Sequence, residues 1–189
     1  MENHEQEKIE YIKKSFELKH QKKYKEAIET LYAKGIVNGR AQNVYAPDEK
    51  VTRAEFVSLI VRSLGRENVS YNSSFEDITS VDWYADSIET ALSLGLISKD
   101  TNFRPNDSIT REEMAKIIVG ASDLKGKVDL PAEFALNFAD TDAISDWAND
   151  FVSKAVHLNL LKGDELGKFN PKNNLTRAES AMVIYRFLQ

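Results

Sequence analysis

Three arginines of this sequence stand in the same local setting and could bind an anion. Each is the second residue of a Thr-Arg-x-Glu tetrad that precedes an apolar stretch, and the tetrads begin at Thr52, Thr110 and Thr176. Such a tetrad is a capping box, in which the Thr hydroxyl accepts from the N3 amide and the Glu carboxylate accepts from the N-cap amide. A helix is therefore predicted to begin at each tetrad, which explains the Thr and the Glu without a ligand.

The tetrad arginines, Arg53, Arg111 and Arg177, need a separate explanation. A cation at the first helical position is disfavoured by about 0.3–1 kcal/mol, because the helix dipole is positive there. Three such arginines indicate that an anionic group lies opposite each. One candidate is an internal salt bridge to Asp77 or Asp140. The other is an anionic ligand, since helix N-termini favour anions and guanidinium binds carboxylate or phosphate through two hydrogen bonds.

The tetrads belong to a repeat that occupies most of the chain. An aromatic-x-Pro step precedes each tetrad, and the aromatic residues are Tyr45, Phe103 and Phe169. An apolar segment with a Gly or Asn precedes each step, and these residues are Gly35, Gly95 and Asn159. Gly and Asn favour the left-handed conformation that ends many helices. Each unit is therefore predicted to be a helix, a loop and a second helix.

The helices are expected to share one core, because a single pair of short helices cannot bury its own apolar stripe. We predict an all-α fold of three helix–loop–helix repeats packed as a pseudo-threefold bundle, with an open row of repeats as the alternative. Loop-forming linkers predict repeats at 1–67, 68–130 and 131–189, which together form one domain. A long charged helix from about Glu5 to Lys34 is predicted to lead the first repeat.

Repeats two and three also share an opening motif, Phe-x-Asp followed by Trp. The acids are Asp77 and Asp140, and the tryptophans are Trp83 and Trp147. Tryptophan lies more often in a core than in a binding site. An exposed Trp beside an Arg would nevertheless suit stacking on a sugar ring, with its N–H available to the ligand. The first repeat has neither the Asp nor the Trp.

Composition argues against several functions. Lys and Arg number 25 against 30 Asp and Glu, for a net charge of −5, so without a basic cluster nucleic acid is not an expected partner. The absence of cysteine removes disulfides, thiol catalysis and Cys-based zinc sites, and the three histidines lack metal-ligand spacing. We expect no metal, cofactor or catalytic residue, since acidic residues at helix starts follow from the dipole alone.

Two further expectations concern location. No apolar run approaches the roughly 18 residues of a membrane-spanning helix, so membrane insertion is not expected. The first residues lack the basic and then apolar pattern of a secretory signal. That start fits either a cytoplasmic protein or a mature fragment with an added Met.

Taken in order, these elements resemble the S-layer homology domain family over about residues 24–189. The resemblance implies a three-repeat, pseudo-threefold domain that anchors surface proteins non-covalently to the bacterial cell wall. The implied ligand is a secondary cell-wall polysaccharide, often with a pyruvylated amino-sugar end, bound in grooves between neighbouring repeats. The implied location is the bacterial cell surface.

The resemblance also implies roles for particular residues. Arg53, Arg111 and Arg177 would pair with the pyruvyl carboxylate. Asp77 and Asp140 would contact sugar hydroxyls, and Trp83 and Trp147 would form an aromatic wall. Gly39 and Gly163 match the loop glycine that lets backbone amides approach the ligand.

Departures from the family pattern limit this expectation. Lys99 stands where repeat two would have the loop glycine, and the nearest acid in the opening of repeat one is Glu17. We therefore expect one or two competent grooves rather than three. The alternative function is a structural module of the same fold that has lost glycan binding and mediates protein–protein packing, with residues 5–34 as a docking helix.

Overall fold

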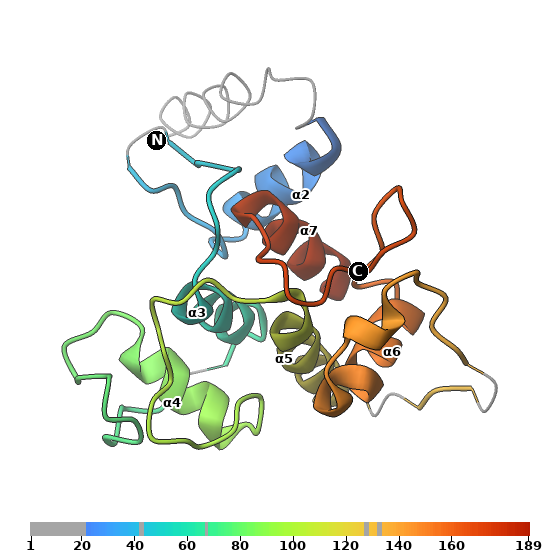
Figure 1. The fold of residues 1–189 in the computed structure, drawn as a ribbon. Coiled ribbons are helices and arrows are strands. Elements are labelled where there is room, and N and C mark those ends of the chain that lie inside the picture. The colour runs from blue at the N-terminus through green and yellow to red at the C-terminus, as the bar shows by residue number, and fades with distance from the viewer. Residues whose placement is uncertain (1–21, 42–43, 67, 127–128, 132–133) are drawn as a thin grey trace.

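The computed structural model describes residues 22–41, 44–66, 68–126, 129–131 and 134–189. Its helices are α2 (Lys22–Ala33), α3 (Arg53–Ser63), α4 (Ala85–Ser93), α5 (Arg111–Asp123), α6 (Asn149–His157) and α7 (Arg177–Phe187), with short 3-10 turns at Thr141–Ala143 and Asp146–Ala148 (Figure 1). Among these residues β pairing is limited to isolated bridges, so the prediction of an all-α fold is confirmed. The predicted helix start near Glu5 falls outside the described residues.

The second helix of each repeat begins as the tetrads predict. The hydroxyls of Thr52, Thr110 and Thr176 accept from the N3 amide at 3.2, 3.3 and 3.2 Å, and the N3 Glu accepts from the N-cap amide in return. The predicted left-handed residues are also confirmed, because φ is +68° at Gly35, +72° at Gly95 and +57° at Asn159. Local sequence therefore sets the ends of these helices.

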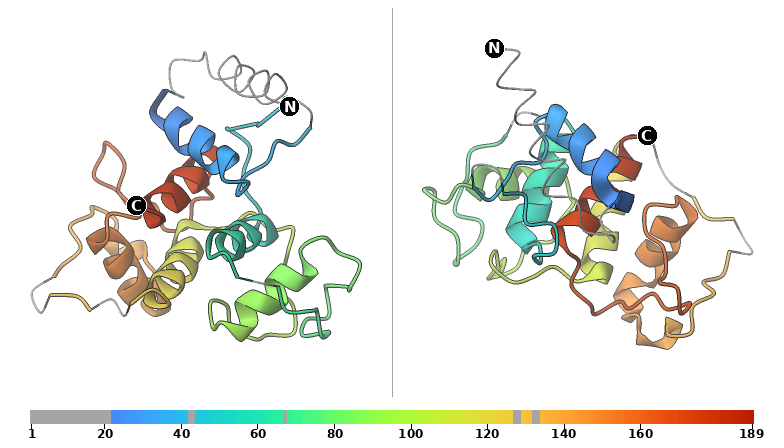
Figure 2. Two further views of the ribbon diagram at one scale, coloured as in Figure 1. Left: turned by 180° about the vertical axis from the view of Figure 1, so that it is seen from behind. Right: turned by 90° about the horizontal axis from the view of Figure 1, so that it is seen from above.

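The helices pair across repeat boundaries rather than within a repeat. Helix α4 packs against α3, α6 packs against α5, and α2 packs against α7 (Figures 1 and 2). The first helix of each repeat thus lies on the second helix of the preceding repeat. For the first repeat, α2 lies on α7 of the third repeat. An open row of repeats would separate α2 from α7, so their contact contradicts that alternative.

The second helices α3, α5 and α7 contact one another at the centre of the molecule (Figure 1). The short segments before them pair through antiparallel bridges, Lys50 with Thr176, Thr52 with Ser108 and Thr110 with Asn174. Between the bridged positions the side chains of Val51, Ile109 and Leu175 are at most 1% exposed. Burying each contributes about 1.5–3 kcal/mol, so this apolar centre brings the three helix N-termini together.

The apolar face of α2 is used inside the molecule. Its Ile28 and Leu31 are fully buried, and Tyr185 of α7 donates a hydrogen bond to Glu26 at 2.8 Å. The described part of the predicted docking helix is thus a packing element of the domain. Residues 5–21 of that prediction lie outside the described part of the chain.

Candidate ligand-binding grooves

Each tetrad arginine holds the loop of a neighbouring repeat. Arg53 donates from Nε to the carbonyl oxygen of Phe103 at 3.0 Å, and its guanidinium lies 4.8 Å from the centre of the Phe103 ring. The same pair of contacts is made by Arg111 with Phe169 and by Arg177 with Tyr45. A guanidinium over an aromatic ring contributes about 0.5–2 kcal/mol. The arginines therefore link repeat one to two, two to three, and three to one.

Carbonyl groups of the same loops occupy the helix N-termini. The amide of Arg53 donates to Asp107 at 2.9 Å, and the amide of Ala54 donates to Pro105 at 3.1 Å. Equivalent amides at the start of α5 and α7 donate to Asn173, Pro171, Glu49 and Pro47. The first-turn amides, which lack partners inside a helix, are thereby satisfied by the next repeat. Because these amides already donate to carbonyl groups, the helix N-termini themselves do not need an anionic ligand.

The charge opposite Arg53 is a glutamate of the next tetrad, not Asp77. Arg53 Nη1 lies 2.7 Å from Glu113 Oε1, with side-chain exposures of 14% and 19%. Burial lowers the pKa of Arg53, and the negative charge of Glu113 opposes that shift. Burial alone would raise the pKa of Glu113, but the amide of Thr110 and the charges of Arg53 and Arg104 outweigh it, so the net pKa lies below its usual value.

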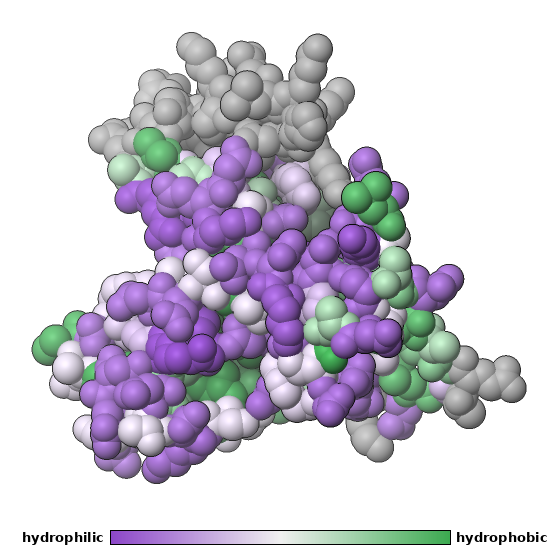
Figure 3. Space-filling model, in the orientation of Figure 1, coloured by the Kyte–Doolittle hydropathy of each residue, from purple (hydrophilic) through white to green (hydrophobic). Residues whose placement is uncertain are grey.

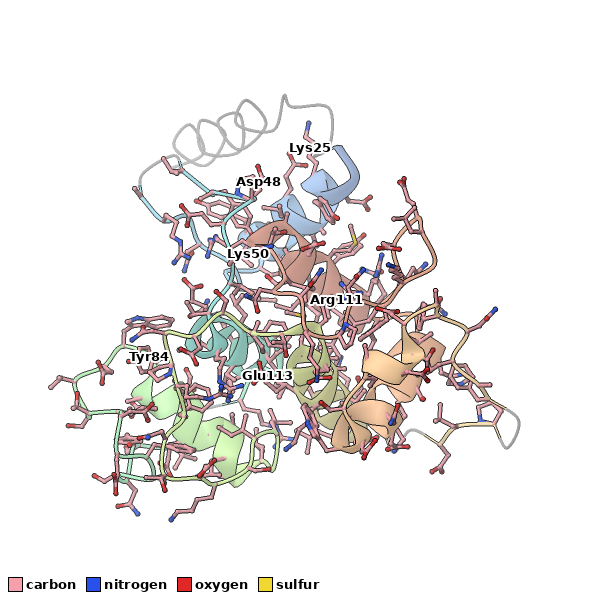
Figure 4. The ribbon with its side chains drawn as sticks, in the orientation of Figure 1. Lys25, Asp48, Lys50, Tyr84, Arg111 and Glu113 are labelled. Carbon is pink, nitrogen blue, oxygen red and sulfur yellow. The ribbon has the colours of Figure 1, made fainter. Side chains whose placement is uncertain are left out.

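The other two arginines have weaker ionic contacts. Arg177 Nη1 lies 3.8 Å from Glu55 Oε1, and Glu55 is also paired with Arg40. Burial lowers the pKa of Arg111, and Glu179 is the largest opposing influence, although no ion pair within 4 Å joins them among the described residues. Each capping Glu therefore faces the tetrad Arg of the preceding repeat. Arg111 and Glu113 accordingly leave the first turn of α5 toward different neighbours (Figure 4).

Asp77 and Asp140 hold the loops rather than the arginines. The two oxygens of Asp77 accept from the amides of Phe103 and Arg104 at 2.8 and 2.7 Å. Asp140 accepts in the same way from the amides of Phe169 and Asn170, both at 2.7 Å. The residue before proline has a positive φ at each step, +61° at Arg104 and +56° at Asn170. The salt bridge to Asp77 or Asp140 that the sequence suggested is therefore not formed among the described residues. Each of these carboxylates instead stabilises the left-handed turn before the proline.

These contacts leave three grooves between the repeats. Groove 1 has a volume of about 480 Å³ and lies among Arg177, loop residues 37–40, Glu55 on α3, and Trp83. Groove 2 has about 350 Å³ and lies among Arg53, the loop within 97–104, Glu113 on α5, and Trp147. Groove 3 has about 620 Å³ and lies among Arg111, the loop within 161–170, Glu179 on α7, and Tyr24. These volumes are typical of small-ligand pockets.

The three grooves follow one rule of construction. One repeat supplies the arginine, the next supplies the loop and the capping glutamate, and the third supplies an aromatic ring. The structure therefore brings Gly39, Arg177 and Trp83 together in groove 1, Arg53 and Trp147 in groove 2, and Arg111 and Gly163 in groove 3. Asp77 and Asp140 lie behind the loops, at their backbone amides.

An aromatic ring lines each groove, and two of the three rings were predicted from the sequence. Trp83 is 65% and Trp147 is 50% exposed, so neither is a core residue. The first repeat lacks a tryptophan, but Tyr24 lines groove 3. It stands eleven residues before Gly35, as Tyr84 stands eleven before Gly95, and Tyr84 lines groove 1 beside Trp83. This shared spacing identifies Tyr24 as the aromatic residue of the first repeat, where the pattern Phe-x-Asp followed by Trp is absent.

The two loop glycines are required by the packing of the chain itself. A Cβ on Gly39 would lie 2.7 Å from the carbonyl oxygen of Val44, and one on Gly163 would lie 2.6 Å from the ring of Phe138. Both glycines line their grooves, so their predicted approach to a ligand stays a prediction. Repeat two carries the exposed Lys99 at the equivalent place, four residues after Gly95.

The lining of all three grooves is cationic. In groove 1 three arginines face one glutamate, Arg40, Arg62 and Arg177 against Glu55. In groove 2 four cations face two carboxylates, Arg53, Lys99, Arg104 and Lys116 against Asp100 and Glu113. In groove 3 four cations face three carboxylates, Lys50, Arg111, Lys162 and Arg186 against Asp164, Glu165 and Glu179. Of these, Lys50 and Arg111 are labelled in Figure 4. Arg40, Arg104 and Lys116 were not predicted from the sequence.

Other kinds of site find little support in the part of the chain that the structure describes. There it contains no cluster of three His, Cys, Asp or Glu residues placed to hold a metal ion. None of the helices described is long and apolar enough to cross a membrane. The face shown in Figure 3 is largely hydrophilic, with apolar residues in small separate patches.

Comparison with known proteins agrees with the repeat. The family model described as "S-layer homology domain" matches residues 19–57, 74–115 and 137–181. The chain is 42% identical over 87% of its length to an amylopullulanase of Thermoanaerobacterium thermosulfurigenes, and 41% over 87% to the exoglucanase XynX of Acetivibrio thermocellus. It is 32% identical over 87% of its length to the surface-layer 125 kDa protein of Lysinibacillus sphaericus. It spans only 9%, 15% and 14% of these proteins.

Proposed function

Because this chain belongs to the S-layer homology domain family, we propose that it binds an anionic, pyruvylated secondary cell-wall polysaccharide in its inter-repeat grooves. The module is a non-catalytic cell-wall anchor of the bacterial surface. Beyond this anchoring role, we propose the chemical class of the ligand and the grooves in which it binds. Since the chain spans a small part of its relatives, the larger activity that the module serves is not assigned by them.

The observation that carries the proposal is the sign of charge in the grooves. The protein as a whole has a net charge of −5, yet cations outnumber carboxylates in the lining of each groove. Positive clefts in an acidic protein attract anionic ligands and raise their local concentration at the groove. A pyruvyl carboxylate on a neutral sugar has the charge that such a groove favours.

The contacts that build the grooves are repeated at all three boundaries between repeats. Each tetrad arginine makes the same two contacts with the next repeat, and the contacts run from one to two, two to three and three to one. We infer that a pseudo-threefold axis passes near Val51, Ile109 and Leu175 and relates the repeats. Repetition of a groove around an axis suits a polymer, because several sugar units of one chain can be bound at once.

The residues predicted from the sequence can act together in such a groove. Among the described contacts each tetrad arginine uses two hydrogen-bonded N–H groups, out of the five that a guanidinium has, and the rest are available to a ligand carboxylate. Exposed Trp83 and Trp147 offer apolar faces for sugar rings. Asp77 and Asp140 support the grooves from behind, because their carboxylates hold the loop backbones at Phe103 and Phe169.

Groove 1 carries a further indication of a ligand. The hydroxyl of Ser58 is buried in the wall of this groove and has no hydrogen-bond partner among the residues described. Buried polar groups are normally paired, and an unpaired one costs about 1–3 kcal/mol. A ligand hydroxyl that reached Ser58 would remove that cost.

Binding to purified secondary cell-wall polysaccharide, measured by calorimetry, tests the proposal. Alanine at the tetrad arginines would also release the loops that they hold, so the exposed tryptophans make cleaner variants. We expect Trp83→Ala/Trp147→Ala to weaken binding about tenfold without changing the melting temperature, since loss of each stacking ring costs about 0.5–1.5 kcal/mol. Val69→Ala, 46% exposed and outside the grooves, is the matched control.

Two outcomes would decide against the ligand. Wild-type protein that binds neither intact polysaccharide nor pyruvylated amino sugar would leave the fold as a packing module. Equal binding before and after removal of the pyruvyl groups would retain a wall anchor but contradict recognition of the carboxylate.

A further inference from the structure

Groove 2 differs from the other two grooves at two places at once. Four residues after the helix-ending Gly or Asn, it has Lys99 where groove 1 has Gly39 and groove 3 has Gly163. Five residues after the tetrad arginine, it has Lys116 where the other grooves have Ser58 and Met182. These two positions therefore carry ammonium groups in groove 2 only.

The two lysines lack a carboxylate partner. Lys116 is half-buried, and its Nζ donates to Ser98 Oγ at 2.8 Å. Ser98 precedes Lys99 in the loop, so the hydrogen bond keeps Lys116 on the loop that carries the second ammonium. Within the described ranges, no carboxylate lies within 4 Å of either ammonium, whereas Arg53 and Arg104 of the same groove both contact Glu113. Among these residues the two arginines are therefore paired with a carboxylate, whereas the two lysines are not.

We propose that Lys99 and Lys116 form a phosphate subsite in groove 2, adjacent to the site for the sugar carboxylate. The inference rests on the proposed function and names a narrower ligand for this groove. Planar guanidinium suits a carboxylate, whereas the compact ammonium acts as a point charge that suits the tetrahedral phosphate. The ligand of groove 2 is thus a wall sugar that carries a phosphate next to its pyruvyl carboxylate.

The other grooves have no equivalent subsite. At the same two places groove 1 has Gly39 and the hydroxyl of Ser58. Groove 3 has Gly163 and the thioether of Met182. A phosphate bound at these two places is therefore specific to groove 2, because the lysines of groove 3, Lys50 and Lys162, lie at other positions of its lining. Trp147, which is 50% exposed on the wall of groove 2, lies close enough to report on its occupancy.

Calorimetry with two synthetic probes tests the subsite. One probe is the methyl glycoside of a pyruvylated amino sugar, and the other is the same sugar as its glycosyl phosphate. We expect wild-type protein to bind the phosphate about 5- to 30-fold more tightly, because the phosphate gains two ion pairs, one of them with the half-buried Lys116. Lys99→Gly/Lys116→Ser, which copies groove 1, should remove most of that preference.

Two controls separate the subsite from general effects. Lys34→Ser/Arg66→Ser removes two positive charges from exposed positions outside the grooves and should keep the preference. In a Trp83→Phe background Trp147 is the single tryptophan, and the phosphate probe should change its fluorescence with the same affinity that calorimetry measures.

The outcomes distinguish the two proposals. Wild-type binding to neither probe overturns the proposed function and the subsite together. Equal wild-type affinity for both probes overturns the subsite alone. A preference for phosphate that survives Lys99→Gly/Lys116→Ser, or binding that leaves Trp147 fluorescence unchanged, also overturns it.

Discussion

Replacement of Glu113 by glutamine separates the two roles of a capping glutamate. Glu113 Oε2 accepts from the amide of Thr110 at 3.0 Å, while Oε1 lies 2.7 Å from Arg53 and 2.9 Å from Arg104. The glutamine carbonyl can still accept from the amide, so Glu113→Gln removes the charge and keeps the cap. Glu179→Gln is the matched control, because Glu179 caps Thr176 at 2.8 Å but has no ion pair within 4 Å among the described residues.

The expected magnitude follows from burial. Arg53 and Glu113 are each less than one-fifth exposed, so their contact is treated as a charge-assisted hydrogen bond of about 1.5–3 kcal/mol. Arg104 is 56% exposed, and its pair with Glu113 adds less than about 1 kcal/mol. Glu113→Gln should therefore lower the free energy of unfolding by about 2 kcal/mol, and Glu179→Gln by less than about 1 kcal/mol. For a chain of this length, 2 kcal/mol corresponds to about 4–8 °C in melting temperature.

The pH dependence gives the decisive measurement. The pKa of Glu113 is lowered on folding from its usual 4.5, so its contribution is complete above that value and is lost as the pH falls through the folded pKa. Urea unfolding should show a difference in the free energy of unfolding between wild type and Glu113→Gln at neutral pH, and this difference should close as the pH falls below 4.5. Equal costs for the two glutamine variants, or a gap that persists in acid, would refute the assignment of an inter-repeat ion pair.

Three further predictions concern other features. Asp140→Ala leaves the amides of Phe169 and Asn170 without their acceptor and should cost about 1.5–3 kcal/mol, measured by thermal denaturation. Leu175→Ala at the apolar centre should cost about 2–5 kcal/mol in urea unfolding, whereas Leu166→Ala, 79% exposed, should cost almost nothing. Trp83→Ala alone should leave the melting temperature unchanged and lower the affinity for wall polysaccharide about fivefold in calorimetry.

The sequence predicted features that depend on a few neighbouring residues. The capping boxes at Thr52, Thr110 and Thr176 and the left-handed residues at Gly35 and Gly95 are confirmed, because each follows from backbone chemistry within one turn.

Features that depend on which repeats touch were not predictable in this way. The partner of Arg53 is Glu113, sixty residues away, and only the cross-repeat packing of the helices brings the two together. The same packing places Tyr24 in groove 3 beside the Arg111 of another repeat. Roles of the predicted site residues toward a ligand stay predictions, since the local contacts explain much of their presence.

The contact between α2 and α7 joins the first and the last of the described helices, which are far apart along the chain. The α2 of a second chain presents the same apolar face, with Ile28 and Leu31, to the same surface of α7. A pair of chains that traded these helices would re-form the α2–α7 contact between molecules, as in domain swapping, and would lose the hydrogen bonds from the amides of Ile36 and Val37 to Leu31 at the junction. Dilution favours the self-closed monomer and crowding at a surface favours the linked pair, because only the linked form depends on protein concentration.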